Sequence, residues 1–530
     1  MTDSGFDIII VGSGPAGISA AFPLVESGLR VAVLDGGREM ETPFPKHPYL
    51  KERLNDPDQW QWMVGEEFYA LRHHEAASPK LRTPTQAYVF EGFAKANRID
   101  TKNFMAIGSL ATGGLSGAWG CGVAKFDDND FISYPFSAAH MEESYVAVSQ
   151  RMGLSGSSED DLSSYFGLDD LASPPVQINP IQEWLFSKYA KRKASLLRKG
   201  VRMGRSRVAV LTEDRENRFA CNLSGNCLWG CDRGSLYTSS TDIPTLKRYK
   251  NFVHMPGCIA ERVSRTSGYP TLEYVTADGT SKVIAARKIV LAAGTLATTR
   301  LALQAIEHRK TITVQSNPSA AFLLWIPGML GRSHTDGFAL GQLSLALSLP
   351  GEKTAYGSLF TPTGIPVSEF LKFVPLRKRY GIDILRNLMS SCLVGNLFLP
   401  GYLGNADATL TRDGTLQIEG RQQEEAIDLF KIAKRKLRID FARMGTILVP
   451  MSFTTGTPGS DIHYAATLPM KENPTEAETN LYGELNGFED LHVVDGACLT
   501  SLPEKPHTLT IMANAHRIGL KLASNLSNRA

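Results

Sequence analysis

The fold of this chain is decided by the stretch Phe6-Asp7-Ile8-Ile9-Ile10-Val11-Gly12-Ser13-Gly14-Pro15-Ala16-Gly17. Its first half is apolar and rich in β-branched residues, which is typical of a buried parallel strand. Three glycines follow at the spacing GxGxxG, and the helical character of residues 18–27 stops near Gly28. A second apolar run, Arg30-Val31-Ala32-Val33-Leu34, ends in Asp35. The order strand, glycine turn, helix, strand and acid predicts a parallel βαβ unit.

This unit predicts a dinucleotide site. Gly12 permits the tight turn, Gly14 lets the backbone approach a pyrophosphate, and Gly17 lets helix and strand pack closely. The helix N-terminus offers N–H donors and the positive end of its dipole to the phosphates. Asp35 follows Gly17 by 18 positions, near the roughly 20 expected for the acid that binds ribose. The alternative is a glycine turn without a ligand. The predicted contacts are Gly12, Gly14, Pro15, Ala16, Gly17, Asp35 and Gly36.

Composition excludes several other classes of protein. The chain has 530 residues, of which 43% are hydrophobic, and 56 Lys and Arg against 54 Asp and Glu, for a net charge of +2. This mixture excludes disorder over the whole chain, and the charge balance gives no support for a nucleic-acid partner. The first residues lack the basic start of a signal peptide, and no apolar window is long enough to span a membrane. We therefore expect a cytoplasmic protein with reduced thiols.

The segment 370–403 combines basic residues with a long apolar tail. It could be a peripheral membrane contact or a surface for a protein partner. The alternative is a basic surface helix followed by a core strand.

A second glycine cluster, from Gly108 to Gly122, holds six glycines in fifteen positions, which indicates backbone packed close to a flat or charged group. A buried strand over 288–293 turns at Gly294 into a helix, and a similar strand over 491–496 precedes a final helix that begins near residue 508. The nucleotide domain is therefore expected to be discontinuous. These segments add the predicted cofactor contacts Gly113, Gly114, Ser116, Ala118, Trp119, Gly294, Asp495, Gly496 and Thr508.

Five motifs, in order along nearly the whole chain, resemble the glucose–methanol–choline family of FAD-dependent oxidoreductases. They are VGSGPAG (Val11–Gly17), GGLSGAWG (Gly113–Gly120), VLAAGTLATTRL (Val290–Leu301), IHYAATLPM (Ile462–Met470) and LHVVDGACLTSLPEKPHTLTIMANA (Leu491–Ala515). The resemblance implies an α/β fold in which a Rossmann-like FAD-binding domain is interleaved with an α+β substrate domain built on an antiparallel sheet. The region of about 310–455 shows little detailed similarity and looks like that substrate-domain sheet.

The resemblance also implies how the chain divides. The FAD-binding domain is expected to gather residues 1–45, 100–130, 205–310 and 455–530. The substrate-binding domain is expected to gather residues 46–99, 131–204 and 311–454.

In this family a bound FAD takes a hydride at N5 from an alcohol while a histidine takes the hydroxyl proton. The resemblance puts His463 at the histidine of the first C-terminal motif and His507 at the second position. Imidazole suits this task because its reference pKa of about 6.5 lets it accept a proton near neutral pH. We expect His507 to be the primary base and His463 to assist it. The alternative is a buried structural role for each.

Three departures from the family pattern matter. Ala466 and Lys471 replace glycines of the first C-terminal motif, which puts the local backbone in doubt. Ala118 stands where relatives bond the flavin to a histidine, so FAD is expected to be non-covalent. Trp119 resembles the sugar-oxidising, pyranose-type branch, although simple packing beside the flavin is an equal alternative.

Three of the seven cysteines are clustered as C-x5-C-x3-C at Cys221, Cys227 and Cys231. In a reducing compartment such clustering favours metal over a disulfide, and three thiolates could hold an iron–sulfur cluster. The loop resembles the iron–sulfur loop of bacterial FAD-dependent sugar dehydrogenases and also the cysteine loops of long-chain alcohol oxidases. A loop of buried thiols without metal, or a zinc site, stays open. The other four cysteines are isolated in the sequence and are expected in the core.

The expected function is the FAD-dependent oxidation of an alcohol, a sugar or polyol, to a carbonyl. One alternative is a lipid-like alcohol, which the apolar region 320–403 would suit. Two others are a non-redox lyase on the same scaffold and a flavin-holding electron-transfer or assembly subunit. The electron acceptor stays open between oxygen, a quinone and a redox protein.

Overall fold

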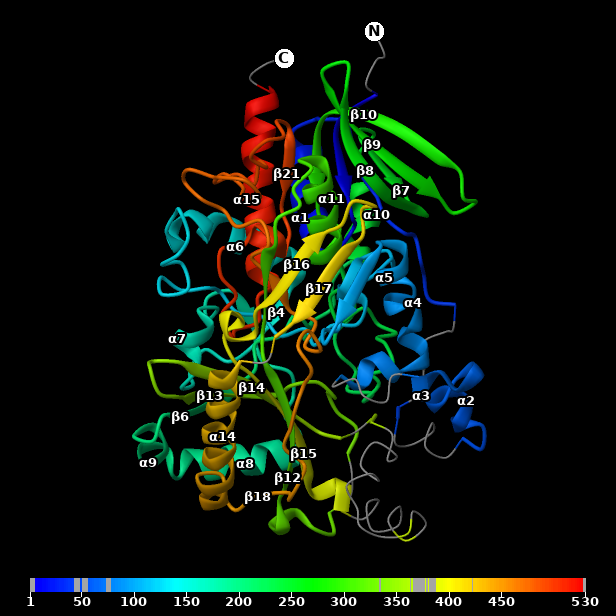
Figure 1. Cartoon of the computed structure of the whole chain (residues 1–530). Coiled ribbons are helices and arrows are strands. Elements are labelled where there is room, and N and C mark those ends of the chain that lie inside the picture. The colour runs from blue at the N-terminus through cyan, green and yellow to red at the C-terminus, as the bar shows by residue number, and fades with distance from the viewer. Residues whose placement is uncertain are drawn as a thin grey trace.

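A computed structural model describes residues 5–41, 48–49, 56–72, 78–332, 335–362, 364–365, 377, 380, 388–421 and 423–527. Within these ranges the chain forms three larger sheets with helices packed on them (Figure 1). Most of residues 370–387 lie outside the described residues, so the prediction of a surface segment at 370–403 is not tested there. In the described part of the chain, no helix is long and apolar enough to cross a membrane.

The first sheet contains the predicted βαβ unit. Its strand order is β7-β2-β1-β10-β9-β8, and β21 also pairs with β10. The strands are β1 (Phe6–Val11), β2 (Val31–Leu34), β7 (Phe252–Met255), β8 (Cys258–Thr266), β9 (Tyr269–Thr276), β10 (Ser281–Leu291) and β21 (Leu491–Val493). Strands β7, β2, β1, β10 and β21 run parallel, whereas β8 and β9 are antiparallel. Residues 8–10 are fully buried, as expected for a parallel strand covered on both faces.

Helices from distant parts of the sequence cover this sheet. They are α1 (Pro15–Glu26), α6 (Glu142–Met152), α10 (Ile243–Leu246), α11 (Thr295–Ala305) and α15 (Thr508–Ser527). The red helix α15 packs along α1, although the two are almost 500 residues apart in the chain (Figure 1). The packing is close because a Cβ added at Gly519 would lie 2.7 Å from the carbonyl oxygen of Ala20.

The region with little sequence similarity forms the substrate-side sheet. Its strand order is β18-β12-β15-β14-β13-β6, with β19 paired to β12, and every pairing is antiparallel. The strands are β6 (Val201–Arg205), β12 (Ser319–Trp325), β13 (Leu343–Ser348), β14 (Thr354–Phe360), β15 (Cys392–Phe398), β18 (Ile447–Leu448) and β19 (Thr454–Thr455). Helices α8 (Pro180–Ala190) and α14 (Glu424–Ile439) share one hydrophobic core with it.

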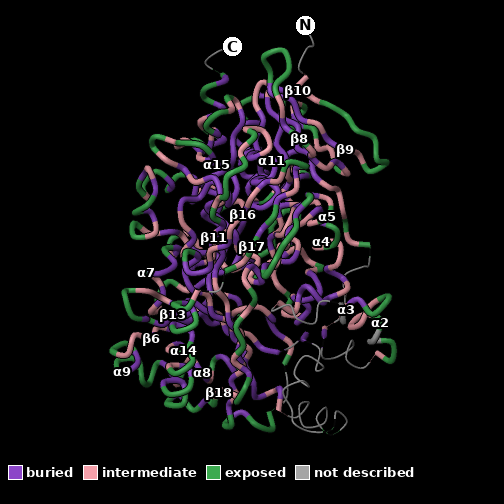
Figure 2. The backbone as a smooth tube through the Cα atoms, in the orientation of Figure 1, coloured by how far each residue is buried: buried purple, intermediate pink, exposed green. Residues whose placement is uncertain are grey.

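A third sheet lies between the other two (Figure 1). Its strand order is β20-β11-β16-β17-β3, made of β3 (Ile99–Lys102), β11 (Ile312–Ser316), β16 (Ala406–Leu410), β17 (Leu416–Gly420) and β20 (Tyr464–Ala465). In the described part of the chain, the remaining α-helices and strands are α2 (Gln59–Met63), α3 (Tyr69–Arg72), α4 (Ala87–Phe90), α5 (Phe93–Ala96), α7 (Ser163–Phe166), α9 (Lys193–Leu197), β4 (Leu154–Ser155) and β5 (Ala172–Ser173). Figure 2 shows the buried backbone in the middle of the molecule and the exposed backbone at hairpin ends and outer helices.

The fold-class prediction is confirmed. The parallel sheet gathers segments 6–34, 252–291 and 491–493, and the middle of the sequence forms the antiparallel sheet. The domain boundaries stay a prediction. The segments of the parallel sheet lie inside the ranges expected for the FAD-binding domain, whereas β6 and β19 of the antiparallel sheet each cross an expected boundary by one residue.

Candidate active site

A cavity of about 520 Å³ lies where the parallel sheet faces the substrate-side sheet. Its wall includes the carboxyl ends of β1 and β2, at Val11 and Leu34, and the residues that follow β10. Ligands of parallel α/β sheets bind beyond these ends. The opposite wall comes from β12, β14 and β15.

The glycine turn after β1 combines tight packing with open space. Gly12 has a φ of +108°, and a Cβ there would lie 2.3 Å from the Ala292 carbonyl oxygen. A Cβ at Gly17 would lie 1.9 Å from the Gly12 carbonyl oxygen, whereas one at Gly14 would meet no atom within 4 Å. Gly14 and Pro15 line the cavity at the N-terminus of α1. The structure therefore leaves room for phosphates at the position where the helix N-terminus would attract them.

Asp35 is fixed at the end of β2 beside this turn. Its carboxylate accepts hydrogen bonds from the Ser13 hydroxyl and the Gly37 N–H and pairs with Nε2 of His254, the last two at 2.8 and 2.9 Å. Asp35 lines the cavity, as expected for a ribose-binding acid. His254 lies on β7. No sequence pattern predicts its contact with Asp35, because β7 pairs with β2 only in the folded sheet.

The second glycine cluster lies over the turn. Gly114–Gly117 form a short 3-10 helix, and the Gly113 N–H donates to the Ser13 hydroxyl at 3.0 Å. The Ser116 hydroxyl donates to the Gly113 carbonyl at 2.5 Å, so it braces the loop from behind. The predicted contacts that line the cavity are Gly12, Gly14, Pro15, Ala16, Asp35, Gly36, Gly114, Ala118, Trp119, Gly294, Asp495, Gly496 and Thr508. Gly17, Gly113 and Ser116 support this wall without lining it.

The C-terminal motifs close the cavity from another side. The Asp495 carboxylate accepts hydrogen bonds from the Gly294 N–H at 2.9 Å and the Thr298 hydroxyl at 2.5 Å, which ties β21 to the start of α11. Burial raises the pKa of Asp495 to about 6. Thr508 begins α15, so a second helix N-terminus reaches the cavity.

The fold brings His463 and His507 together across 44 positions of sequence. Their rings meet edge to face, with centroids 4.7 Å apart. His507 is buried, while His463 faces the cavity with 29% of its side chain exposed. Burial lowers the pKa of His507 to about 4, and burial together with His507 lowers the pKa of His463. Both shifts favour the neutral imidazole, which is the form that can accept a proton.

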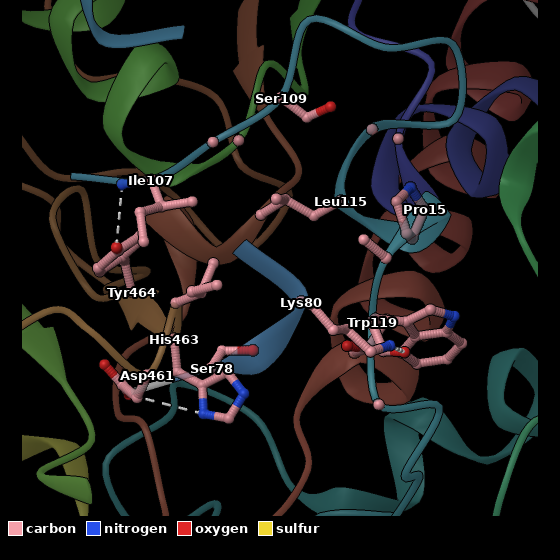
Figure 3. A pocket seen from close by; sticks show the side chains of 18 of the residues that line it. Pro15, Ser78, Lys80, Ile107, Ser109, Leu115, Trp119, Asp461, His463 and Tyr464 are labelled. Carbon is pink, nitrogen blue, oxygen red and sulfur yellow. Dashed lines mark hydrogen bonds and ion pairs between the residues drawn. The ribbon is translucent and has the colours of Figure 1, made fainter. Parts of the chain in front are cut away.

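Three ionisable side chains in this cavity escaped the sequence prediction. Asp461 lies next to His463, and Lys80 extends to Trp119, where its Nζ donates to the backbone carbonyl (Figure 3). Glu504 lines the opposite side and accepts a hydrogen bond from the Tyr165 hydroxyl at 3.0 Å. Burial lowers the pKa of Lys80 to about 8 and raises that of Glu504 to about 7. Asp461 and Glu504 lie close to the motif histidines in the sequence, and this proximity is the signal that could have identified them as site residues.

The three clustered cysteines lie on a half-buried loop beside the cavity wall. Cys121 was expected as an isolated core residue, but it lies near them. Burial raises the pKa of its thiol, and Lys80 and the three clustered thiols also act on that pKa. Within the described residues, no group of His, Cys, Asp or Glu side chains is arranged to hold a metal ion. Among the described residues, the structure therefore gives no support for an iron–sulfur cluster or a zinc ion at Cys221, Cys227 and Cys231.

Both the N-terminal glycine turn and the overall fold have counterparts in known proteins. Residues 7–43 match a family model described as an FAD binding domain. No curated protein has a matching sequence. Among solved structures, the chain is similar to pyridoxine 4-oxidase from Mesorbium loti, with 14% identity, a TM-score of 0.58, and coverage of 97% of this chain and 99% of that one.

It is also similar to two variants of formate oxidase from Aspergillus oryzae RIB40, each with 12% identity, a TM-score of 0.61 and 99% coverage of both chains. These likenesses extend over nearly the full length of the chain. Residues 7–43 therefore match an FAD-binding model, and the chain has the fold of these FAD-dependent oxidases over nearly its full length.

Proposed function

We propose that this protein is an FAD-dependent oxidoreductase that oxidises an alcohol to a carbonyl compound. The observation that carries the proposal is the meeting of His463 and His507 in the same cavity as the glycine turn. The fold neighbours, an oxidase of pyridoxine and an oxidase of formate by name, support the reaction class.

The cavity fits FAD by its own geometry. Gly14 and Gly294 both face space in which an added Cβ would meet no protein atom within 4 Å. The N-termini of α1 and α15 reach the same space and offer N–H donors to phosphate and to a polar ring edge. Asp35 would take the ribose, and Ala118 and Trp119 would lie beside the ring system. Ala118 has no nucleophile, so the bound FAD would be non-covalent.

The chemistry divides between the cofactor and the chain. Bound FAD would supply a two-electron acceptor for the hydride that leaves the carbinol carbon. The chain supplies the proton acceptor, because an alcohol is a poor hydride donor until its hydroxyl proton is being removed. The two neutral imidazoles can each hold that proton. Loss of the hydride and the proton together leaves the carbonyl product.

The substrate-side wall favours a sugar or another polyol. Polar side chains from three strands line it, namely Ser319 of β12, Tyr356 and Ser358 of β14, and Asn396 of β15. Glu504 adds a carboxyl group that could bind a substrate hydroxyl. The same wall contains Phe360, Val394 and Phe398, which keeps a lipid-like alcohol as the second candidate.

Anaerobic reduction of bound FAD tests this proposal. Sugars, sugar derivatives and lipid alcohols are mixed with the oxidised protein, and loss of the yellow absorbance is followed. We expect reduction by one polyol class and loss of at least about 10³-fold in rate when His463 and His507 are both changed to Ala. His140→Ala, at an exposed histidine outside the cavity, is the matched control.

Two results would overturn the proposal: unchanged reduction in the double variant, or no reduction by any alcohol. Release of a carbonyl compound from a cyanohydrin without reduction would favour the lyase, and co-purification of another chain would favour the assembly subunit. Oxygen, a quinone and a redox protein stay the predicted acceptors, and the cytoplasm stays the predicted location.

As a separate proposal, we infer that Cys221, Cys227 and Cys231 together hold an iron–sulfur cluster. The proposal is supported by their spacing C-x5-C-x3-C on one half-buried loop. A cluster needs its thiolates further apart than a single metal ion does. Iron and acid-labile sulfide are measured in anaerobically purified protein. Protein with full FAD content and no iron would overturn the proposal.

A further inference from the structure

Asp461 is a buried carboxyl group directly beside His463. Its side chain is only 1% exposed, and its Oδ2 lies 3.6 Å from Nδ1 of His463, an ion-pair contact drawn in Figure 3. Within the described chain, neither oxygen of this carboxyl has a hydrogen-bond partner of full geometry, and Nδ1 of His463 also lacks one. Backbone groups of Asp461, Asn317 and His463 also act on this carboxyl, and Nδ1 of His463 is the polar side-chain atom that faces it.

The backbone between these two residues is held in an unfavourable conformation. Ile462 has a φ of +64°, in the left-handed region that β-branched residues rarely adopt. Its N–H is held by the Gly459 carbonyl at 3.1 Å. Such strain persists only where the surrounding structure imposes it, and it is concentrated at functional sites. Here it brings the side chains of positions 461 and 463 together.

The other neighbours of His463 cannot replace the carboxylate. His507 meets it edge to face, and Phe398 packs against its ring at 5.0 Å between centroids. Tyr464, the next residue, has its hydroxyl bonded to the carbonyls of Met105 and Gly459. Glu504 and Lys80 line the same cavity but are bonded to Tyr165 and to the Trp119 carbonyl.

We propose that Asp461 is a positioning residue that accepts the Nδ1 proton of His463 and so leaves Nε2 free as the acceptor of the substrate proton. The tautomer of a histidine is set by the hydrogen bond that its other nitrogen makes. A distance of 3.6 Å is compatible with this role, because such contacts tighten when substrate binds. The inference rests on the proposed function and makes His463, not His507, the primary base.

The pairing also explains how a buried site could hold the proton. Once Nε2 takes the proton, the imidazole becomes a cation in a region where burial lowers the pKa of His463. An ionised Asp461, whose Oδ2 lies 3.6 Å from Nδ1, would balance that charge, although burial raises the pKa of this carboxyl.

Asp461→Asn tests the role in the FAD-loaded protein, with Asp407→Asn as the matched control. Asp407 is a half-exposed residue of β16, paired with Arg421 outside the cavity. Reduction of FAD is followed across pH at saturating and limiting substrate. We expect Asp461→Asn to lower the maximal rate by about 10²- to 10⁴-fold, with a smaller effect on the substrate concentration needed. We expect the acid limb of its pH profile to move to lower pH, because the remaining imidazole protonates less readily.

A second readout does not depend on activity. Protein labelled with ¹⁵N in its histidines reports which ring nitrogen carries the proton, and His463→Gln assigns the signal. We expect Nδ1 to be protonated in the parent protein and in Asp461→Glu, which should also recover part of the rate, and the tautomer to shift in Asp461→Asn.

The two proposals fail in different ways. If no alcohol reduces the parent protein, the proposed function fails, and the nitrogen signals still decide whether Asp461 holds His463. If the parent protein is reduced and Asp461→Asn keeps its rate, pH profile and tautomer, the inference is wrong. Should Asp461→Asn not fold, the parent protein carries the decision, because a His463 whose Nδ1 lacks the proton contradicts the inference.

Discussion

Gly14 and Gly17 lie three positions apart and have opposite surroundings. A side chain at Gly14 would enter open space at a φ of −63°, which any residue can adopt, whereas one at Gly17 would strike the Gly12 carbonyl. We therefore expect Gly14→Val to fold with the stability of the FAD-free parent and to lose FAD, because the added methyl groups occupy the phosphate position. Absorbance of the purified protein at the flavin band and thermal unfolding measure the two effects.

Gly17→Val is the contrasting variant. Its Cβ would lie 1.9 Å from a backbone oxygen, so we expect a loss of unfolding free energy of at least about 3 kcal/mol or no folded protein. If Gly14→Val kept full FAD, the open space would not be the phosphate site.

Ala466 shows how far a family pattern can be carried to a single residue. The glycine expected in the motif is alanine here, yet Ala466 keeps a φ of +61°. Its N–H is bonded to the Gly496 carbonyl at 3.1 Å, which holds the turn against β21 and the cavity. The doubt raised by the sequence is resolved because the surrounding hydrogen bonds impose the glycine-like backbone at a cost of about 1–2 kcal/mol.

The contact between α1 and α15 joins the first and last parts of the chain. Gly519→Ala tests its tightness, because the new methyl group would lie 2.7 Å from the Ala20 carbonyl oxygen. Alanine favours a helix over glycine by about 1 kcal/mol, but overpacking costs about 1–3 kcal/mol. We expect a net loss of about 1 kcal/mol in urea unfolding. Ser524→Ala, exposed on the same helix, should be neutral or slightly stabilising, and a stabilised Gly519→Ala would show that the helices have room to separate.

The strands of the nucleotide sheet were predictable because local patterns specify them. Runs such as Phe6–Val11 and 288–291 are short, apolar and followed by glycine, and parallel strands of this type are buried on both faces. The third sheet was not predictable. Its pairing of β3 with β17 joins residues 99–102 to 416–419, and neither segment carries a signal of its partner.

The site residues also differ in whether the sequence could predict them. The glycines, Asp495 and both histidines belong to motifs, so their roles could be predicted from a resemblance. The roles of Lys80 and His254 could not be predicted. Lys80 reaches the cavity wall from a short 3-10 helix, and His254 contacts the Asp35 carboxylate from β7. The positions of both segments depend on pairing between distant parts of the chain. The position of Cys121 near the clustered cysteines could not be predicted for the same reason.

Burial of histidine makes the stability of the whole molecule sensitive to acid. His516 of α15 bonds through Nδ1 to the Ser144 hydroxyl of α6 at 3.0 Å, and burial, with the charge of Arg151, lowers its pKa to about 4. A histidine with a lowered pKa stabilises the fold above its unfolded value of 6.5, and this contribution is lost as pH falls toward 4. We expect the parent protein to lose about 1–3 kcal/mol more than His516→Gln over that interval.

Urea unfolding of both proteins at each pH measures this difference. Glu504 acts in the opposite direction, since its pKa of about 7 lies above that of an unfolded glutamate and stabilises the fold as pH falls. That contribution is common to the two proteins and cancels when their curves are subtracted. Parallel curves would show that His516 becomes charged without loss of packing between α6 and α15.

FAD should stabilise the molecule as a whole, because the cavity is lined by residues from Val11 to Ile511 and from both facing sheets. A ligand that binds only the folded state adds about 4 kcal/mol at a concentration of 1,000 Kd. With Ala118 unable to form a bond, acid precipitation should release FAD into the supernatant. Protein freed of FAD should then unfold at lower temperature and regain stability as FAD is added back. Colour retained in the pellet would indicate a covalent link through another residue, and equal melting with and without FAD would mean that the cofactor does not join these segments.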